Sequence, residues 1–362
     1  MKKDWTYKKF EDCIENVKYT TKIQSKDYMA SGGYPIISQE EELVSGYWNK
    51  NEDVFSAPRP LVVFGDHTRV LKYIDFDFVL GADGVKILLP IEDLEAKFLY
   101  YFLKWYNVPN LGYSRHYKLL KEISIPIPPL SIQRSIVAEL DLLHSVISKK
   151  KEQLRELDDL AQSLFYQMFG DPITNPMGWE IKKLGEVAPV KSYQGDIVSE
   201  KGLYWLLNLD MVEAQTGKIL EKNMLDKDEI GNSTTSFSPD NVLYSKLRPY
   251  LNKVVLPDTC GYCTTELLPL LPQKDILNRE YLCYLLRSKS FVDYINIKVA
   301  GAKMPRVTMD DFRNFPIPLP PLSLQQSFAA KVSAIEAQKQ AITLSIKETE
   351  ALLAQRMDTY FS

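Results

Sequence analysis

The sequence predicts an α+β protein in which two mixed α/β domains are joined by two long α-helices that form an antiparallel coiled coil, with pseudo-twofold internal symmetry. Three observations predict this class. The chain has 362 residues, which exceeds one ordinary domain core. Its two halves repeat each other, and each half ends in a run with coiled-coil spacing. The expected parts are a first domain at 1–128, a central helix at 129–170, a second domain at 171–320 and a C-terminal helix at 321–362.

A proline-rich phrase occurs twice in nearly the same form. It reads IPIPPLSIQRS at 125–135 and IPLPPLSLQQS at 317–327. The offset of 192 positions holds without a gap from the pair Ile123 and Phe315 to the pair Phe169 and Phe361. The two halves also start alike, because WTYKKF near the N-terminus resembles WEIKKL further along the chain. The chain therefore reads as a tandem duplication.

The first part of each half is rich in aromatic and β-branched residues broken by Gly, Asn and Asp, as in LVVFGDHTRVLKYIDFDFVLGADGVKILL. This composition predicts strands and turns with a few helices. The parts after the proline phrases are predicted to be helical. Consecutive prolines fix an extended entry, and Ser131 or Ser323 then stands where an N-cap is favoured.

Both helical runs carry apolar residues at alternating steps of four and three, which is the spacing of a coiled-coil seam. Such a stripe can pack on any neighbouring core, but two long helices with matching seams favour packing against each other. The first predicted seam is Ile136, Leu140, Leu143, Ile147, Lys150, Leu154, Leu157, Ala161, Leu164 and Met168. The second, which has more polar members, is Phe328, Val332, Ile335, Lys339, Ile342, Ile346, Thr349, Leu353, Arg356 and Tyr360.

Composition limits the functional classes. The net charge of −3 implies that any nucleic-acid contact is local rather than spread over the whole surface. Four cysteines and no N-terminal apolar stretch predict neither a disulfide framework nor a signal peptide. No apolar run approaches the length of a membrane span. We therefore expect a cytoplasmic protein.

The sequence offers little for catalysis. None of the three histidines stands at metal-ligand spacing, and the CxxC of Cys260 and Cys263 lacks a second pair. Motifs for phosphate binding, dinucleotide binding and a serine nucleophile are missing from the sequence. The nearest approach to a nuclease is Asp93, Glu95 and Lys97, a pattern that equally suits a solvated first helical turn. We expect no catalytic residue, metal or cofactor in this chain, and a metal-dependent nuclease is the alternative.

Basic segments with aromatic residues recur at equivalent places in both halves. They are GDHTRVLKY at 65–73 and NLGYSRHYKLLK at 110–121, then YSKLRPYLNK at 244–253 and INIKVAGAKMPR at 295–306. Their cations suit phosphates, while arginine and amide side chains can read base edges. The candidate DNA-binding residues are Arg69, Lys72, Arg115, His116, Lys118, Lys246, Arg248, Asn252, Lys253, Lys303 and Arg306.

The whole chain resembles the specificity subunit of a type I restriction-modification system. The resemblance is carried by the two proline phrases with their helices and by the runs at 60–88 and 242–272. It implies two target-recognition domains, each reading half of a bipartite site in double-stranded DNA, with helices that space them. It also implies assembly with two methyltransferase subunits and with restriction/translocase subunits, and these partners would use S-adenosylmethionine, ATP and Mg²⁺. A coiled-coil adaptor without a DNA role is a further alternative.

Overall fold

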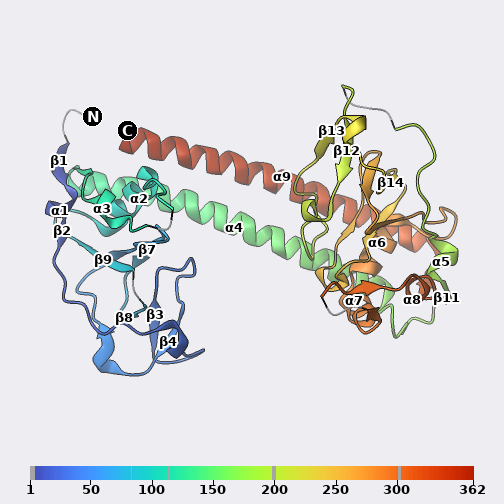
Figure 1. Cartoon of the computed structure of the whole chain (residues 1–362), viewed down its shortest axis with the longest axis horizontal. Coiled ribbons are helices and arrows are strands. Elements are labelled where there is room, and N and C mark those ends of the chain that lie inside the picture. Colours follow the sequence, from blue (N-terminus) through green and yellow to red (C-terminus); the bar gives the residue numbers. More distant parts are fainter. Residues whose placement is uncertain (1–4, 83, 113, 198–200, 301–302) are drawn as a thin grey trace. The chain divides into compact units, whose positions relative to one another are not determined.

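The computed structural model describes residues 5–82, 84–112, 114–197, 201–300 and 303–362. The chain divides into two compact units (Figure 1). Unit 1 comprises residues 1–150 and 344–362, and unit 2 comprises residues 151–343. The two long helices, α4 (Leu130–Phe169) and α9 (Leu322–Phe361), each contribute one part to each unit.

Within its described residues, unit 1 contains two four-stranded sheets and a two-stranded ribbon. The sheet β2-β9-β6-β7 is antiparallel, whereas β4-β3-β8-β5 contains one parallel pair, β3 with β8. Apolar side chains of the two sheets, including Val63, Ile87 and Phe78, form the buried core. The elements are β1 (Thr6–Lys9), α1 (Phe10–Cys13), β2 (Ile14–Glu15), β3 (Tyr34–Ile37), β4 (Gly46–Trp48), β5 (Val54–Phe55), β6 (Leu61–Gly65), β7 (Leu71–Ile74), β8 (Phe78–Leu80), β9 (Val85–Pro90), α2 (Ala96–Tyr106), α3 (Tyr117–Leu120) and β10 (Ser124–Ile127).

Unit 2 repeats this plan. Its sheet β13-β12-β17-β14 again has one parallel pair, β12 with β17, and β16-β15-β18 is again antiparallel. The elements are β11 (Glu180–Lys183), α5 (Leu184–Val187), β12 (Tyr204–Leu207), β13 (Asn223–Leu225), β14 (Thr234–Phe237), β15 (Val242–Ser245), β16 (Val254–Val255), β17 (Gly261–Thr264), β18 (Leu267–Leu270), α6 (Arg279–Arg287), α7 (Lys289–Asn296), β19 (Val299–Ala300), β20 (Arg306–Val307), α8 (Met309–Arg313) and β21 (Pro316–Leu319). The predicted α+β class and the internal repeat are confirmed.

The proline phrases pair with the segments that open each half. In unit 1, β1 runs antiparallel to β10 with Tyr7 opposite Pro126. In unit 2, β11 runs antiparallel to β21 with Ile181 opposite Pro318. Proline has no N–H for a ladder bond, so it suits a short ribbon with free edges better than the centre of a sheet. The likeness of WTYKKF and WEIKKL therefore reflects a common strand partner.

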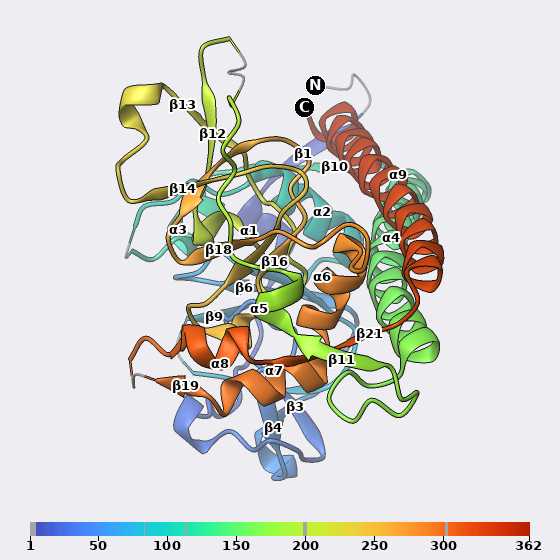
Figure 2. The same cartoon turned by 90° about the vertical axis from the view of Figure 1, so that its right-hand side faces the viewer.

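The two long helices pack against each other in antiparallel orientation, as predicted (Figures 1 and 2). In unit 1, the Nζ atom of Lys150 on α4 lies 2.6 Å from Oγ of Ser345 on α9. In unit 2, the Nζ atom of Lys339 on α9 lies 2.6 Å from Oδ1 of Asp158 on α4. Every residue of the two predicted seams is buried or half-buried.

Aromatic residues outside the predicted seams anchor the ends of the helices. In unit 1, Phe361 at the end of α9 packs against the rings of Phe98 in the first turn and Trp105 in the last turn of α2. In unit 2, Phe169 at the end of α4 lies with its ring centre 4.7 Å from that of Tyr281 on α6. Each long helix thus contributes its last turn to the core of one domain.

Buried glutamines fix the starts of the helices. Both helices begin one residue before the expected caps Ser131 and Ser323, because the Pro129 carbonyl already accepts the first helical bond from Gln133 N at 3.1 Å. The Gln133 side chain is 0 % exposed, and its Nε2 donates to the Pro128 and Asp93 carbonyls, at 2.8 Å each. Its Oε1 accepts from Glu95 N at 2.8 Å.

Gln325 repeats this arrangement in unit 2. It is also 0 % exposed, and its Nε2 donates to the carbonyls of Pro320 at 2.8 Å and Ile276 at 3.0 Å. Its Oε1 accepts from Asn278 N at 2.8 Å. Glu95 and Asn278 are themselves the N-caps of α2 and α6. Each glutamine therefore joins the start of a long helix to the start of a domain helix.

We expect Gln325→Leu to lower the free energy of unfolding by about 3 kcal/mol, because the change leaves buried backbone groups of residues 276, 278 and 320 without their partner. Urea titration followed by circular dichroism measures this loss. The matched control is Gln326→Leu, since Gln326 is exposed in the same helical turn. Equal urea midpoints for the two variants would contradict the role assigned to the buried amide.

Candidate nucleic-acid interface

Two basic segments of unit 2 that are far apart in the sequence lie side by side. The Arg248 N–H donates to the Pro305 carbonyl at 2.8 Å, and Val307 N donates to the Lys246 carbonyl at 3.0 Å. Leu247 forms an antiparallel bridge with Arg306. The pairing joins the turn after β15 to β20, and we call residues 246–248 and 303–307 the basic ribbon of unit 2.

Glu266 moderates the charge of this ribbon. Its carboxylate holds the Arg306 guanidinium through contacts of 3.0 to 3.3 Å, and it lies 4.0 Å from the Lys246 ammonium. Arg248 and Lys303 are exposed, and within the described part of the chain their side chains enter no ion pair. These two cations are therefore the most accessible to a phosphate.

Unit 1 brings its two basic segments together in the same way. His116 donates from Nδ1 to the Asp66 carbonyl at 2.9 Å, and its Nε2 accepts from Leu111 N at 3.0 Å. Tyr117 N donates to Asp66 Oδ1 at 2.8 Å. These bonds tie residues 110–118 to the turn after β6. Arg115 and Lys118 on this segment are exposed.

An arginine with left-handed backbone occupies the turn after the equivalent strand in each unit. Arg69 follows β6 with φ of 64°, and Arg248 follows β15 with φ of 50°. Such a conformation costs a non-glycine residue about 1 kcal/mol or more. Strain of this kind collects at functional sites, which favours both turns as contact points. The two side chains differ, because Arg69 Nη1 donates to the Val108 carbonyl at 2.9 Å.

Four of the predicted candidates have their polar groups engaged inside the protein. Lys72 is 4 % exposed and donates to the Glu42 carbonyl, and Lys253 donates to the Leu209 carbonyl at 2.6 Å. Burial lowers the pKa of both lysines. His116 is 0 % exposed, and Asn252 is 9 % exposed with Nδ2 donating to the Arg287 carbonyl at 3.0 Å. The residue types alone did not show that these four side chains point into the protein.

Sequence reasoning missed three further residues of these surfaces. Asp66 and Glu266 organise the basic segments, although acids give no signal for phosphate binding. Lys86 lies 5.3 Å from the ring centre of Tyr117 and 3.9 Å from the Asp66 carboxylate. Its place as the one charged residue in the otherwise apolar strand β9 was the available signal.

The nuclease pattern does not form a cluster. Glu95 caps α2 by accepting from Phe98 N at 2.7 Å, and burial raises the pKa of its carboxyl group. Lys97 pairs with Asp141 at 2.7 Å, and Asp93 lies 3.9 Å from the Lys8 ammonium. Among the described residues, no group of three His, Cys, Asp or Glu is placed to hold a metal ion.

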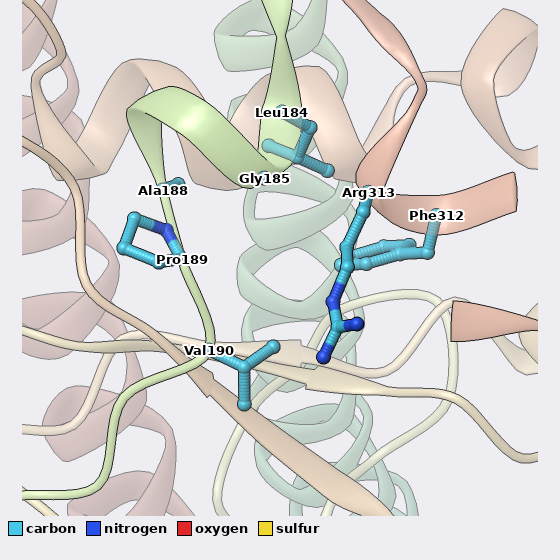
Figure 3. Close-up of a pocket in the computed structure, with 7 residues that line it drawn as sticks. All are labelled: Leu184, Gly185, Ala188, Pro189, Val190, Phe312 and Arg313. Carbon is cyan, nitrogen blue, oxygen red and sulfur yellow. The ribbon is translucent and has the colours of Figure 1, made fainter. Parts of the chain in front are cut away.

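Neither Cys263 nor a small pocket of unit 2 offers a nucleophile with a nearby base. Burial raises the pKa of Cys263 to about 12, so its thiol is protonated at neutral pH. A pocket of about 100 Å³ between α5 and α8 is lined mostly by apolar residues, and the side chain of Arg313 points toward Val190 (Figure 3). None of the described residues that line it is an acid, a histidine or a nucleophile. Within the described ranges no helix has both the length and the apolar character for a transmembrane segment.

A family model and a sequence relative both match most of this chain. The profile of the family described as "Type I restriction modification DNA specificity domain" matches residues 2–158 and 176–349. The type I restriction enzyme EcoR124I/EcoR124II specificity subunit of Escherichia coli is 22 % identical over 368 residues, which cover 94 % of this chain and 88 % of the relative.

Two solved structures share the fold. The S subunit of a type I restriction-modification system from M. genitalium has a TM-score of 0.61 at 12 % identity, covering 99 % of this chain and 96 % of its own. A chain from a study of complex assembly in a type I R-M system has a TM-score of 0.56 at 17 % identity, covering 99 % and 97 %.

We expect Glu266→Gln to increase the affinity for nonspecific duplex DNA about threefold to tenfold, because it releases Arg306 and Lys246 from their acidic partner. Fluorescence anisotropy with a labelled duplex at several salt concentrations measures the change. The control is Asp240→Asn, which removes the same charge at the opposite end of β15, where Asp240 pairs with Lys274. An equal effect of both substitutions would show that only net charge matters.

Proposed function

The chain belongs to the family of type I restriction-modification DNA specificity proteins, and from this premise we propose how its two units divide the recognition of one DNA target. It is a specificity subunit with two target-recognition domains. Specificity subunits are not catalytic, and catalysis lies in the methyltransferase and restriction subunits of the complex.

Each target-recognition domain reads one half of a bipartite site in double-stranded DNA. The observation that supports this is the matched pair of basic surfaces, each built from a turn after β6 or β15 and from the segment before a proline phrase. Exposed cations on these surfaces suit phosphate contacts, and arginine can read guanine in the major groove. Most of the binding free energy comes from the four exposed cations, Arg115, Lys118, Arg248 and Lys303. Three further cations contribute after they leave their internal partners: Arg69, Lys246 and Arg306.

The long helices set the gap between the two half-sites. Each spans 40 residues, which corresponds to about 60 Å of helix. A paired helix is far stiffer than a flexible linker, so its length fixes the number of unread base pairs. In this proposal residues 1–128 and 171–320 are the recognition domains, and residues 129–170 and 321–362 are the spacer helices.

The partners follow from this division of labour. An internal repeat offers two similar surfaces, so one chain can bind two copies of a methyltransferase subunit. Restriction/translocase subunits complete the assembly. S-adenosylmethionine, ATP and Mg²⁺ serve these partners, and the complex works in the cytoplasm.

We expect Arg248→Ala to weaken binding to the second half-site about tenfold while the complex still assembles. The target is first identified by mapping methylated adenines in a host that carries the system. Duplexes with one half-site scrambled then separate the two recognition domains. Lys274→Ala is the control, since Lys274 is an exposed cation near the opposite end of β15. Equal loss at both half-sites would argue against this assignment of domains.

We expect a helical insertion to lengthen the target. A copy of the preceding seven residues is inserted after Lys150 in α4 and after Thr343 in α9, so that the heptad pattern continues in both helices. The added length of about 10 Å corresponds to roughly three base pairs. Methylation mapping measures the new gap. An unchanged gap in a complex that still methylates DNA would refute the spacer role.

A further inference from the structure

Two adjoining pockets open on unit 1 between α2, β7 and α4. Their volumes are about 350 and 250 Å³, and they share Leu71, Tyr100 and Lys104 as lining residues. We call the two pockets together the α2 groove. None of the functions assigned above uses it, apart from Arg69 at one edge.

The α2 groove combines aromatic rings with positive charge. Among the described residues that line it, the cations are Arg69, Lys72, Lys97 and Lys104, and the one acid is Glu41. Tyr101 stacks on His144 at 5.5 Å between ring centres. The Lys104 ammonium lies 5.6 Å from the centre of the Tyr100 ring. The groove therefore attracts a negatively charged ligand.

Three of the four cations already have a polar partner within unit 1. Lys72 donates to the carbonyl of Glu42, Arg69 donates to that of Val108, and Lys97 is paired with Asp141. Lys104 is exposed, and no ion pair involves it within the described ranges. A ligand carboxylate or carbonyl oxygen can therefore bind Lys104 without breaking an internal contact.

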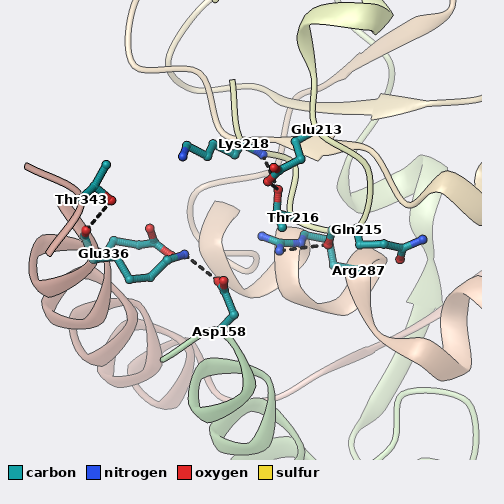
Figure 4. A network of polar contacts seen from close by, with 9 residues as sticks. Asp158, Glu213, Gln215, Thr216, Lys218, Arg287, Glu336 and Thr343 are labelled. Atoms are coloured by element: carbon teal, nitrogen blue, oxygen red, sulfur yellow. Dashed lines mark hydrogen bonds and ion pairs between the residues drawn. The ribbon is translucent and has the colours of Figure 1, made fainter. Parts of the chain in front are cut away.

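The equivalent face of unit 2 is already occupied. The N-caps Glu95 and Asn278 are equivalent, since each is bonded to a buried glutamine, and nine residues after them stand Lys104 and Arg287. Arg287 Nη2 donates to the Gln215 carbonyl at 3.3 Å (Figure 4). A loop of the chain itself thus presents a carbonyl oxygen to the cation of this face.

The loop that carries Gln215 packs tightly against its own unit. Gln215 N donates to the Leu251 carbonyl at 2.9 Å, and Gln215 Nε2 donates to the Tyr250 carbonyl at 3.0 Å. Gly217 has φ of 66°, and a Cβ there would lie 1.9 Å from the Val254 carbonyl oxygen. The backbone at Gly217 therefore lies directly on β16.

Loop length explains why unit 1 lacks such a cover. In unit 2, fifteen residues, 208–222, connect β12 to β13. In unit 1, eight residues, 38–45, connect β3 to β4, and they reach only the edge of the groove at Glu41 and Leu43. The same surface is thus closed in one unit and open in the other.

We propose that the α2 groove of unit 1 is a docking site for an acidic turn of a protein subunit of the complex, which places an oxygen on Lys104 as Gln215 does on Arg287. This rests on the proposed function, because it requires a complex with protein subunits. A peptide fits better than DNA, since a duplex is too wide to enter concave pockets of a few hundred Å³. A peptide turn is also what fills the matching face of unit 2.

The test uses a photo-crosslinking amino acid at Leu43, which is 49 % exposed and lines the groove. The full chain is assembled with its methyltransferase and restriction subunits and a target duplex, then irradiated. We expect an adduct with a protein subunit at an acidic segment, and Lys104→Glu should lower its yield at least tenfold. Lys26→Glu, an exposed lysine outside the groove, and a crosslinker at Met29 are the controls.

The outcomes distinguish failure of the docking site from failure of the proposed function. An adduct with DNA alone, or no protein adduct in a complex that assembles and binds its target, overturns the docking site and leaves the proposed function intact. A protein adduct that Lys104→Glu and Lys26→Glu leave equally strong also overturns it. If the unmodified chain neither assembles nor binds DNA, the proposed function fails and this inference fails with it.

Discussion

The buried amides of Gln133 and Gln325 are the contacts on which the arrangement of this protein depends. Each makes three hydrogen bonds in a site that excludes water, and each bond reaches a different segment: the proline phrase, the turn before a domain helix, and the N-cap of that helix. Apolar packing alone would allow a helix to rotate or slide by a small amount. A fully bonded buried amide does not, because every displacement leaves polar groups unpaired. The start of each long helix is thereby fixed to its own domain.

Polar residues within the helix pair restrict its register in a different way in each unit. Lys150 in unit 1 is held by the hydroxyl groups of Ser345 and Thr349. In unit 2, burial alone would lower the pKa of Lys339, but its ion pairs with Asp158 and Glu336 raise it. Polar groups at interface positions cost stability and disfavour other alignments, because a shifted register would bury them unpaired. The repeat has therefore kept its fold while its interface became asymmetric.

Asymmetry extends to the surfaces. Both units present a basic turn and a basic segment, which suits two readers of DNA, but Glu266 restrains the cations of unit 2 and Asp66 organises those of unit 1. A longer loop closes one face of unit 2 and leaves its equivalent open in unit 1. Duplicated domains that share a scaffold are free to diverge in loops, where changes in length cost little. Different half-sites and different protein contacts are the expected result.

The sequence by itself determined the duplication, the two long helices, their seams and the places of the basic segments. These features depend on patterns along the chain, such as apolar residues at steps of three and four, which act through local geometry. Only the tertiary structure decided that the basic segments meet in pairs, that Lys72 and His116 face inward, and that the glutamines of the proline phrases are buried. The direction of a polar side chain depends on which distant backbone groups need a partner. Those partners come from loops of variable length, so no spacing in the sequence identifies them.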